Sequence, residues 1–381
     1  MKFLHLSDLH IGKTVNGFSM LHEQRHVFEQ IIKYIDSECP KVVLIAGDVY
    51  DRAIPSIEAV QIFDDFLTII AKKNVGVILI SGNHDSPERL NFASRLLSER
   101  NLYLCGLFDG KLNSVTLSDE YGELNFWMLP FVKPSGIRSM FTETEIDTYT
   151  DAIRLILESA NIDYTKRNIL LSHQFYISSG ITPIRSESEI NSIGGLDAVD
   201  AGLLSKFDYV ALGHLHSPQS IGNNGHYCGS PIKYSFSEWK QNKSVTLVEI
   251  KEKGEITLTN LPIYPLHDMR EIKGPLEQLL SNKVLSQGNK EDYLRVILTD
   301  EEEIIDAMGK VKSIYPNVMS LDFENSHSNM DISSTLACSD EFEKLSPYDM
   351  FCEFYLEFYG STLSVEQKKI VRELLEDKEQ E

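Results

Sequence analysis

Residues 41–51 read KVVLIAGDVYD, an apolar run that leads into a glycine and two aspartates. A short, continuous apolar run that ends at a turn residue is typical of a strand buried on both faces. Similar runs occur at 2–7 (KFLHLS) and 75–82 (VGVILISG), and patterns with helical spacing separate them at 20–37 and 57–73. This alternation predicts an α/β fold whose parallel or mixed sheet is covered by helices.

Polar clusters follow many of the expected strands. Further strands are predicted at 123–130, 167–173, 207–214, 226–229 and 243–250. Most of these runs lead into a turn and then into polar side chains. Because open α/β sheets bind ligands beyond the carboxyl ends of their strands, the polar clusters form the candidate site.

The stretch PIYPLH at 262–267 indicates a domain boundary, because it places two prolines beside aromatic and apolar residues. The sequence predicts a first domain at 1–262, a small α+β capping domain at 263–325, a polar linker at 326–345 and a helical tail at 346–381. Within the capping domain we expect strands at 269–273, 293–299 and 318–323, and helices at 275–283 and 301–313.

Composition excludes several classes of protein. The 36 Lys and Arg against 57 Asp and Glu give a net charge of −21, which argues against a protein that binds nucleic acid through a basic surface alone. An enzyme that holds phosphate through metal ions is compatible with this charge. No apolar run is long enough for a membrane span. The cysteines are scattered and form no CxxC pair, so we expect a reducing, cytoplasmic location.

The polar clusters combine carboxylate, imidazole and amide groups. The candidate metal ligands are Asp8, His10, Asp48, Asn83, His173, His214 and His216. Each cluster alone is weak evidence, because an aspartate at a strand end is more often a turn or cap residue. Together they match the donor set of a divalent metal site of mixed character. Two residues that are two positions apart on an extended segment, such as His214 and His216, point the same way.

The ordered set DxH, GDxxD, GNHD, H and GHxH resembles the calcineurin-like metallophosphoesterase superfamily. Within it, ALGHLHSPQ at 211–219, CGSPIKYSFSE at 228–238 and RSESEINSIGG at 185–195 resemble the family of nuclease subunits of bacterial SbcCD complexes. The resemblance implies a two-sheet sandwich flanked by helices, followed by the capping domain and C-terminal helices.

The resemblance also implies two divalent metal ions, expected to be Mn²⁺. One would be held by Asp8, His10, Asp48 and His216, and the other by Asp48, Asn83, His173 and His214, so that Asp48 bridges them. His84 would be the catalytic acid that protonates the leaving sugar oxygen. Asp51 is either a second group that faces the substrate or a structural residue. Arg52 beside it would contact phosphate or pair with an acid on the surface.

The activity implied is hydrolysis of phosphodiester bonds in DNA, as an exonuclease and endonuclease on double-stranded ends and hairpins in repair and recombination. The expected partners are an SbcC-type ATPase and a second copy of the chain, in a heterotetramer. The segment 347–360 would dock on that ATPase or simply pack in its own core, and the resemblance favours docking. Cations that could help to hold DNA are Lys13, Arg89, Arg185, Lys233 and Lys240, with a solvated surface role as the default for each.

Three other functions compete with this interpretation. HEQRH at 22–26 matches the HExxH of metalloproteases, but no third ligand follows at a suitable spacing. GDVYDR resembles the GDxxDRG of protein phosphatases, which would make the chain a phosphomonoesterase, yet Ala53 and Asp85 depart from that pattern. A scaffold without activity is disfavoured because every ligand position holds a competent residue.

Overall fold

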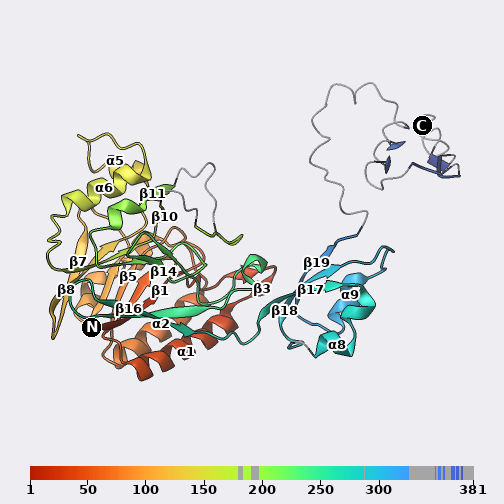
Figure 1. Ribbon diagram of the computed structural model, residues 1–381, viewed down its shortest axis with the longest axis horizontal. Coiled ribbons are helices and arrows are strands. Elements are labelled where there is room, and N and C mark those ends of the chain that lie inside the picture. The colour runs from red at the N-terminus through yellow and green to blue at the C-terminus, as the bar shows by residue number, and fades with distance from the viewer. Residues whose placement is uncertain are drawn as a thin grey trace. The chain divides into compact units, whose positions relative to one another are not determined.

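The computed structural model of the chain describes residues 1–178, 183–189, 197–286 and 288–325, together with 348, 351–352, 355–356, 362–364, 366–368 and 370–371. It divides into two compact units, Met1–Arg270 and Glu271–Glu381, which we describe separately (Figure 1). The expected linker at 326–345 lies outside the described residues, as does most of the expected tail at 346–381. The domain boundaries inferred from the sequence therefore stay predictions.

The first unit contains two six-stranded sheets. The first sheet has the order β16-β15-β1-β4-β5-β6. Its parallel strands are β1 (Lys2–Leu6), β4 (Val42–Ala46), β5 (Gly76–Ile80) and β6 (Leu102–Cys105). The strands β15 (Ser244–Ile250) and β16 (Ile256–Pro262) join its other edge in antiparallel pairing. The segment predicted from KVVLIAGD is thus a central strand.

The second sheet has the order β13-β14-β12-β9-β8-β7. Its strands are β7 (Asn113–Asp119), β8 (Gly122–Leu129), β9 (Arg167–Ser172), β12 (Tyr209–Leu212), β13 (Gln219–Ile221) and β14 (Gly225–Tyr227). The four strands β8, β9, β12 and β14 run parallel, and β7 and β13 form antiparallel edges. Both sheets are therefore mixed, as the sequence indicated.

The two sheets pack face to face. Alternate residues of the first sheet, such as Phe3 and Leu44, share one core with Phe126 and Ile169 of the second. Helices α1 (Leu21–Glu38) and α2 (Ile57–Lys72) cover the outer face of the first sheet, and α5 (Pro134–Arg138) and α6 (Tyr149–Ser159) cover the second (Figure 1). The result is the expected sandwich flanked by helices, in which strands with two buried faces are apolar throughout.

Shorter elements complete the first unit. They are β2 (Thr14–Val15), β3 (Phe18–Ser19), α3 (Pro87–Leu90), α4 (Ser94–Ser98), β10 (Phe175–Ile177), β11 (Ala198–Asp200) and the 3₁₀ turns η2 (Ala201–Leu204) and η3 (Phe236–Glu238). Among the described residues, no helix is both long and apolar enough to cross a bilayer.

The second unit has a three-stranded sheet in the order β17-β18-β19, made of β17 (Met269–Gly274), β18 (Tyr293–Leu298) and β19 (Val318–Phe323). Its helices are α7 (Leu276–Leu279), α8 (Asn282–Leu285) and α9 (Ala307–Lys312). The helix expected at 301–313 was predicted too long. It begins only after Asp306, which has a φ of 52° and whose side chain accepts a hydrogen bond from the Gly309 amide.

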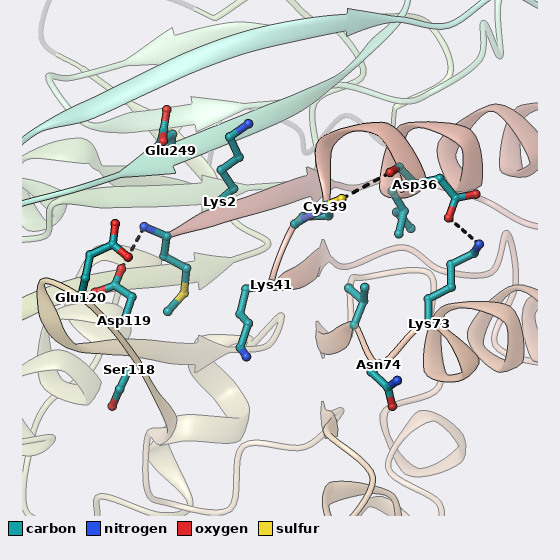
Figure 2. A pocket seen from close by; sticks show the side chains of 14 residues that line it. Lys2, Asp36, Cys39, Lys41, Lys73, Asn74, Ser118, Asp119, Glu120 and Glu249 are labelled. Atoms are coloured by element: carbon teal, nitrogen blue, oxygen red, sulfur yellow. Dashed lines mark hydrogen bonds and ion pairs between the residues drawn. The ribbon is translucent and has the colours of Figure 1, made fainter.

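A pocket lies at one end of the parallel strands of the first sheet, and the candidate site lies at the other. A pocket of about 600 Å³ lies where β1, β4 and β5 begin, and Lys2, Lys41 and Asn74 line it (Figure 2). The opposite ends of the same strands lead into Asp8, Asp48 and Asn83. The candidate site therefore lies at the carboxyl ends of the strands, as the general rule for α/β sheets predicts.

Candidate metal centre

Strained turns bring the predicted ligands out of the first sheet. Asp8, His10 and Asp48 have φ angles of 53°, 41° and 50°, in the left-handed region that most side chains avoid. The turns hold each other, because the Asp8 amide donates to Gly47 O (3.1 Å) and the His10 amide to Asp48 O (2.9 Å). Such strain persists only where surrounding contacts fix it, and it marks functional sites.

The turn after β4 requires a glycine at position 47. The φ of Gly47 is 88°, and a Cβ at this position would lie 2.3 Å from Nδ1 of His173. The backbone of the first sheet can therefore approach a histidine of the second sheet only because no side chain intervenes.

The turns from both sheets converge on one buried cluster. Asp8, His10 and His216 place ligand atoms within 4.8 Å of one another, as do Asp8, Asp48 and His173. The Nε2 atoms of His10 and His216 lie 3.1 Å apart. The structure thus brings together residues that are up to 208 positions apart along the chain.

Asn83 completes the second half of the cluster. Its Oδ1 lies 3.1 Å from Nε2 of His173 and 3.0 Å from Nδ1 of His214, while Asp48 Oδ2 is 3.2 Å from the same His173 nitrogen. All the candidate ligands inferred from the sequence therefore lie in one place. Their assignment as ligands stays a prediction.

Protonation states show how this cluster suits cations. Burial holds the pKa of His10 well below its usual range, and burial together with His173 lowers that of His214 to about 3, so both rings are neutral and keep a lone pair. His173 Nδ1 donates to Ala46 O (2.7 Å). Burial alone would lower the pKa of His173, but the Asp48 carboxylate raises it to about 9. The negative charge of the buried carboxylates therefore stabilises positive charge within the cluster.

The donor set fits divalent metal ions. Imidazoles, carboxylates and an amide oxygen converge in a buried space, and these groups together suit first-row divalent cations. The His173 bond to Ala46 fixes its tautomer and leaves Nε2 facing the cluster, as is usual for a ligating histidine.

His84 forms a third group of candidate ligand atoms with His10 and Asp48, and its ring contacts the backbone of Asp51. The His84 amide donates to Asp48 Oδ1 (2.9 Å), and its Nδ1 lies 2.9 Å from Asp51 O, a carbonyl that can only accept. The half-buried Asp51 carboxylate accepts from Lys13 Nζ (2.7 Å) and lies 3.7 Å from His10 Nδ1. Arg52 is 80% exposed, with its Nε 3.7 Å from Asp51.

The sequence interpretation assigned no role to Asp85, which holds the site together. Its buried carboxylate accepts from the amides of Val49 (3.1 Å), Tyr50 (2.9 Å) and Gly82 (2.9 Å). Burial and the nearby Asp48 raise its pKa to about 6. Asp85 thereby ties the loop after β4 to the loop after β5. Its place in the GNHD motif was visible, but its partners were not.

Gln24 was also missed, because it lies inside the HExxH match. Its amide donates to His10 O (2.7 Å), and its carbonyl accepts from the Gly12 amide (3.0 Å), so α1 fixes the loop after β1. Glu23 of the same stretch accepts from His267 Nδ1 (2.7 Å), and His22 is exposed. The HExxH pattern is therefore a helix that supports the site rather than a metal-binding motif.

The candidate DNA-binding cations have various partners. Lys233 pairs with Asp268 (2.6 Å), Lys240 lies over the ring of Trp239 and Arg185 over the ring of Phe175. Lys13 pairs with Asp51, and Arg89 is exposed. Their role in DNA binding stays a prediction.

The chain is similar in sequence to known proteins over nearly its whole length. Residues 1–218 match the calcineurin-like phosphoesterase family, and residues 265–358 match a family described as the type 5 capsule protein repressor C-terminal domain. The chain is 34% identical over 387 residues to SbcD, the nuclease subunit of SbcCD, from Staphylococcus saprophyticus, and 33% identical over 383 residues to SbcD from Staphylococcus epidermidis. Each alignment covers 98% of both chains. A solved dimetal phosphatase from Danio rerio is 11% identical, with a TM-score of 0.40, over 68% of this chain and 95% of its own.

Proposed function

Because the chain belongs to the calcineurin-like phosphoesterases and, over nearly its whole length, to the SbcD nuclease family, we propose that it is the nuclease subunit of an SbcCD-type complex. It hydrolyses phosphodiester bonds in DNA, acting as an exonuclease and endonuclease on ends and hairpins during repair and recombination. The observation that carries this proposal is the convergence of carboxylate, imidazole and amide ligands from both sheets on one buried cluster.

Two divalent cations, most simply Mn²⁺, would occupy this cluster. Asp8, His10, Asp48 and His216 would hold one, and Asp48, Asn83, His173 and His214 the other. Bound there, the ions would activate water at neutral pH and neutralise the charge on the phosphodiester. Asn83 contributes an uncharged oxygen, which limits the negative charge that an incoming phosphate meets.

His84 would protonate the leaving sugar oxygen. Its Nδ1 donates to the Asp51 carbonyl, so the proton that transfers would leave from Nε2. The amide bond from His84 to Asp48 keeps the ring beside the cluster. Asp51 would act mainly by positioning, since its backbone orients His84 and its carboxylate pairs with Lys13.

A partner would compensate for the acidic surface. With a net charge of −21, the chain alone offers little cationic surface for the DNA backbone. We therefore expect an SbcC-type ATPase to supply much of the DNA groove and to bind the tail at 346–381. The assembly would contain two copies of each chain and act on DNA in the cytoplasm.

A phosphomonoesterase or protein phosphatase is the less favoured alternative, because the family over the whole length is that of nucleases. The test is an assay of the purified chain, with and without its ATPase partner, on hairpin DNA and on p-nitrophenyl phosphate. We expect Mn²⁺-dependent DNA cleavage that a chelator abolishes. Efficient turnover of the monoester with none of the DNA would refute the proposal.

The variant Asp48→Ala tests the metal cluster directly, because this carboxylate would bridge both ions. We expect it to lose at least one Mn²⁺ per chain in elemental analysis. Asp64→Ala on the exposed face of α2 is the matched control and should keep the metal content of the wild type. An unchanged Mn²⁺ content in Asp48→Ala would contradict the bridging role.

A further inference from the structure

His216 is held on three sides by residues that no motif of the metal cluster contains. Its amide donates to Glu189 Oε1 (2.7 Å), and its carbonyl accepts from Lys243 Nζ (2.9 Å). Its ring Nδ1 lies 2.8 Å from Ser188 Oγ. The segment at 183–189 therefore holds both the ring and the amide of His216, and Lys243, far away in sequence, holds its carbonyl.

The contact to Ser188 continues to a buried ion pair. Ser188 Oγ donates to Glu238 Oε1 (2.8 Å), and Glu238 Oε2 lies 2.6 Å from Lys243 Nζ. The side chains of Glu238 and Lys243 are 0% and 3% exposed. A buried pair of this kind persists only with good geometry and further hydrogen bonds, and this one has them in Ser188 and in the His216 carbonyl.

These contacts define the direction of each proton. Ser188 Oγ also lies 2.8 Å from Ser186 Oγ, but a carboxylate is the stronger acceptor, so the single Ser188 proton goes to Glu238. The oxygen of Ser188 then accepts from Nδ1 of His216. With its proton on Nδ1, the ring keeps its lone pair on Nε2, the atom that faces His10 Nε2 at 3.1 Å.

We propose that Ser188, Glu238 and Lys243 form a relay, the His216 relay, that selects the metal-binding tautomer of His216. Glu238 acts as a positioning residue mainly through Ser188, since its own oxygen lies 3.5 Å from His216 Nδ1, and Lys243 balances its charge and holds the His216 backbone. The relay acts on the ion that Asp8, His10, Asp48 and His216 would bind, and not on the ion beside Asn83. This inference rests on the proposed two-metal site and deepens it.

The test uses Ser188→Ala, which removes the relay hydroxyl without leaving a buried charge unpaired. Outer hydrogen bonds of metal ligands typically change affinity by about 10–100-fold. We expect a Mn²⁺ titration followed by calorimetry to show one affinity as in the wild type and the other weaker by about that factor. Raising the Mn²⁺ concentration should restore DNA cleavage, so that the concentration needed for half-activation rises while the saturated rate is retained.

Two further variants separate positioning from general stability. Ser186→Ala makes the same chemical change in the same segment but leaves the path from His216 to Glu238 intact, so it should bind both ions as the wild type does. Ser188→Thr keeps the hydroxyl and should recover the weakened affinity. The melting temperature of the metal-free Ser188→Ala protein should match that of Ser186→Ala.

Glu238→Gln is the more direct change, but it leaves Lys243 buried without its anion and can prevent folding. Ser188→Ala therefore decides the question. The relay is refuted if both Mn²⁺ affinities of Ser188→Ala equal those of the wild type, or if both fall together with the melting temperature. Should the wild type itself bind fewer than two ions, the proposed metal site fails instead, and the two failures are distinguishable.

Discussion

Asp85→Asn is the substitution that best tests how the site is held together. Asparagine has the same shape as aspartate but lacks the charge. Only its carbonyl oxygen can accept a hydrogen bond, because its NH₂ group is a donor. Asp85 Oδ2 accepts from Val49 and Gly82, and Oδ1 accepts from Tyr50. The carbonyl oxygen of asparagine can replace only one of these oxygens, and we expect it in the place of Oδ2, which accepts two hydrogen bonds. The NH₂ group then faces the Tyr50 N–H, which loses its acceptor.

The size of the effect follows from these three bonds. Hydrogen bonds to charged groups contribute about 1.5–3 kcal/mol each, and neutral ones about 1 kcal/mol. Asp85→Asn loses the hydrogen bond from Tyr50 and replaces the other two, which are made to a carboxylate, by weaker ones to a neutral carbonyl. It also relieves the electrostatic repulsion between Asp85 and Asp48. We expect a net loss of about 2–4 kcal/mol in the free energy of unfolding. For a unit of this size that corresponds to a fall in melting temperature of roughly 5–15 °C.

The assay is thermal unfolding of the metal-free protein followed by circular dichroism, together with a Mn²⁺ titration. Affinity for Mn²⁺ should also fall, because the loops that carry Asp48 and Asn83 are no longer tied together. Asp64→Asn, on the exposed face of α2, is the matched control and should change stability by less than about 0.5 kcal/mol. If Asp85→Asn has the same melting temperature as Asp64→Asn and binds Mn²⁺ with the affinity of the wild type, the role assigned to Asp85 is wrong.

Three other outcomes are expected. His84→Ala should slow DNA cleavage by about 10²–10⁴-fold, the usual contribution of a general acid, with its Mn²⁺ content unchanged in elemental analysis. Gly82→Ala should lose Mn²⁺, because its Cβ would lie 2.1 Å from Asp48 Oδ1 and displace that carboxylate. Burial alone would raise the pKa of Asp119, but the Arg167 guanidinium and the N-terminal ammonium hold it well below its usual range. This stabilisation is full above the unfolded pKa of about 3.9 and is lost as pH falls below it, so acid unfolding should begin at higher pH in Asp119→Asn.

Each of these outcomes has its own check. Loss of Mn²⁺ from His84→Ala would make His84 a ligand rather than the acid. Gly136→Ala is the control for Gly82→Ala, since a Cβ there meets no atom within 4 Å, and equal Mn²⁺ loss in both would argue for a general effect of alanine. Identical acid-unfolding curves for the wild type and Asp119→Asn would show that this ion pair contributes no stability.

The sequence predicted most of the central strands, and the place where the candidate ligands gather, because both depend on local patterns. A short apolar run such as 42–46 that ends at a glycine is typical of a buried strand, and a polar residue directly after such a strand lies at the sheet edge. The side chains of Asp48 and Asn83 could thus be assigned to one site before any contact was known. Helix α6 was not predicted, although the capping box formed by Thr148 and Asp151 was a visible signal.

The supporting residues could not be predicted, because their partners are distant in sequence. Glu238 and Lys243 are close to each other in sequence, but the contact of Glu238 with Ser188 depends on how the segment at 183–189 packs. Asp85 acts through backbone amides, which carry no signature in the sequence. In the capping domain the error was local instead. The pattern at 301–313 favoured a long helix, but the left-handed turn at Asp306 makes the helix begin only at Ala307.

The pairing of β1 with β15 has a consequence for biosynthesis. Leu4 lies opposite Leu247, so β1 meets this partner only after most of the first unit has been synthesised. At ordinary translation speeds of about 5–20 residues per second, the wait is roughly 10–50 seconds. His216 also emerges late, so a nascent chain has no complete set of cation ligands during this time. A translation product interrupted before His216 therefore lacks part of the candidate ligand set.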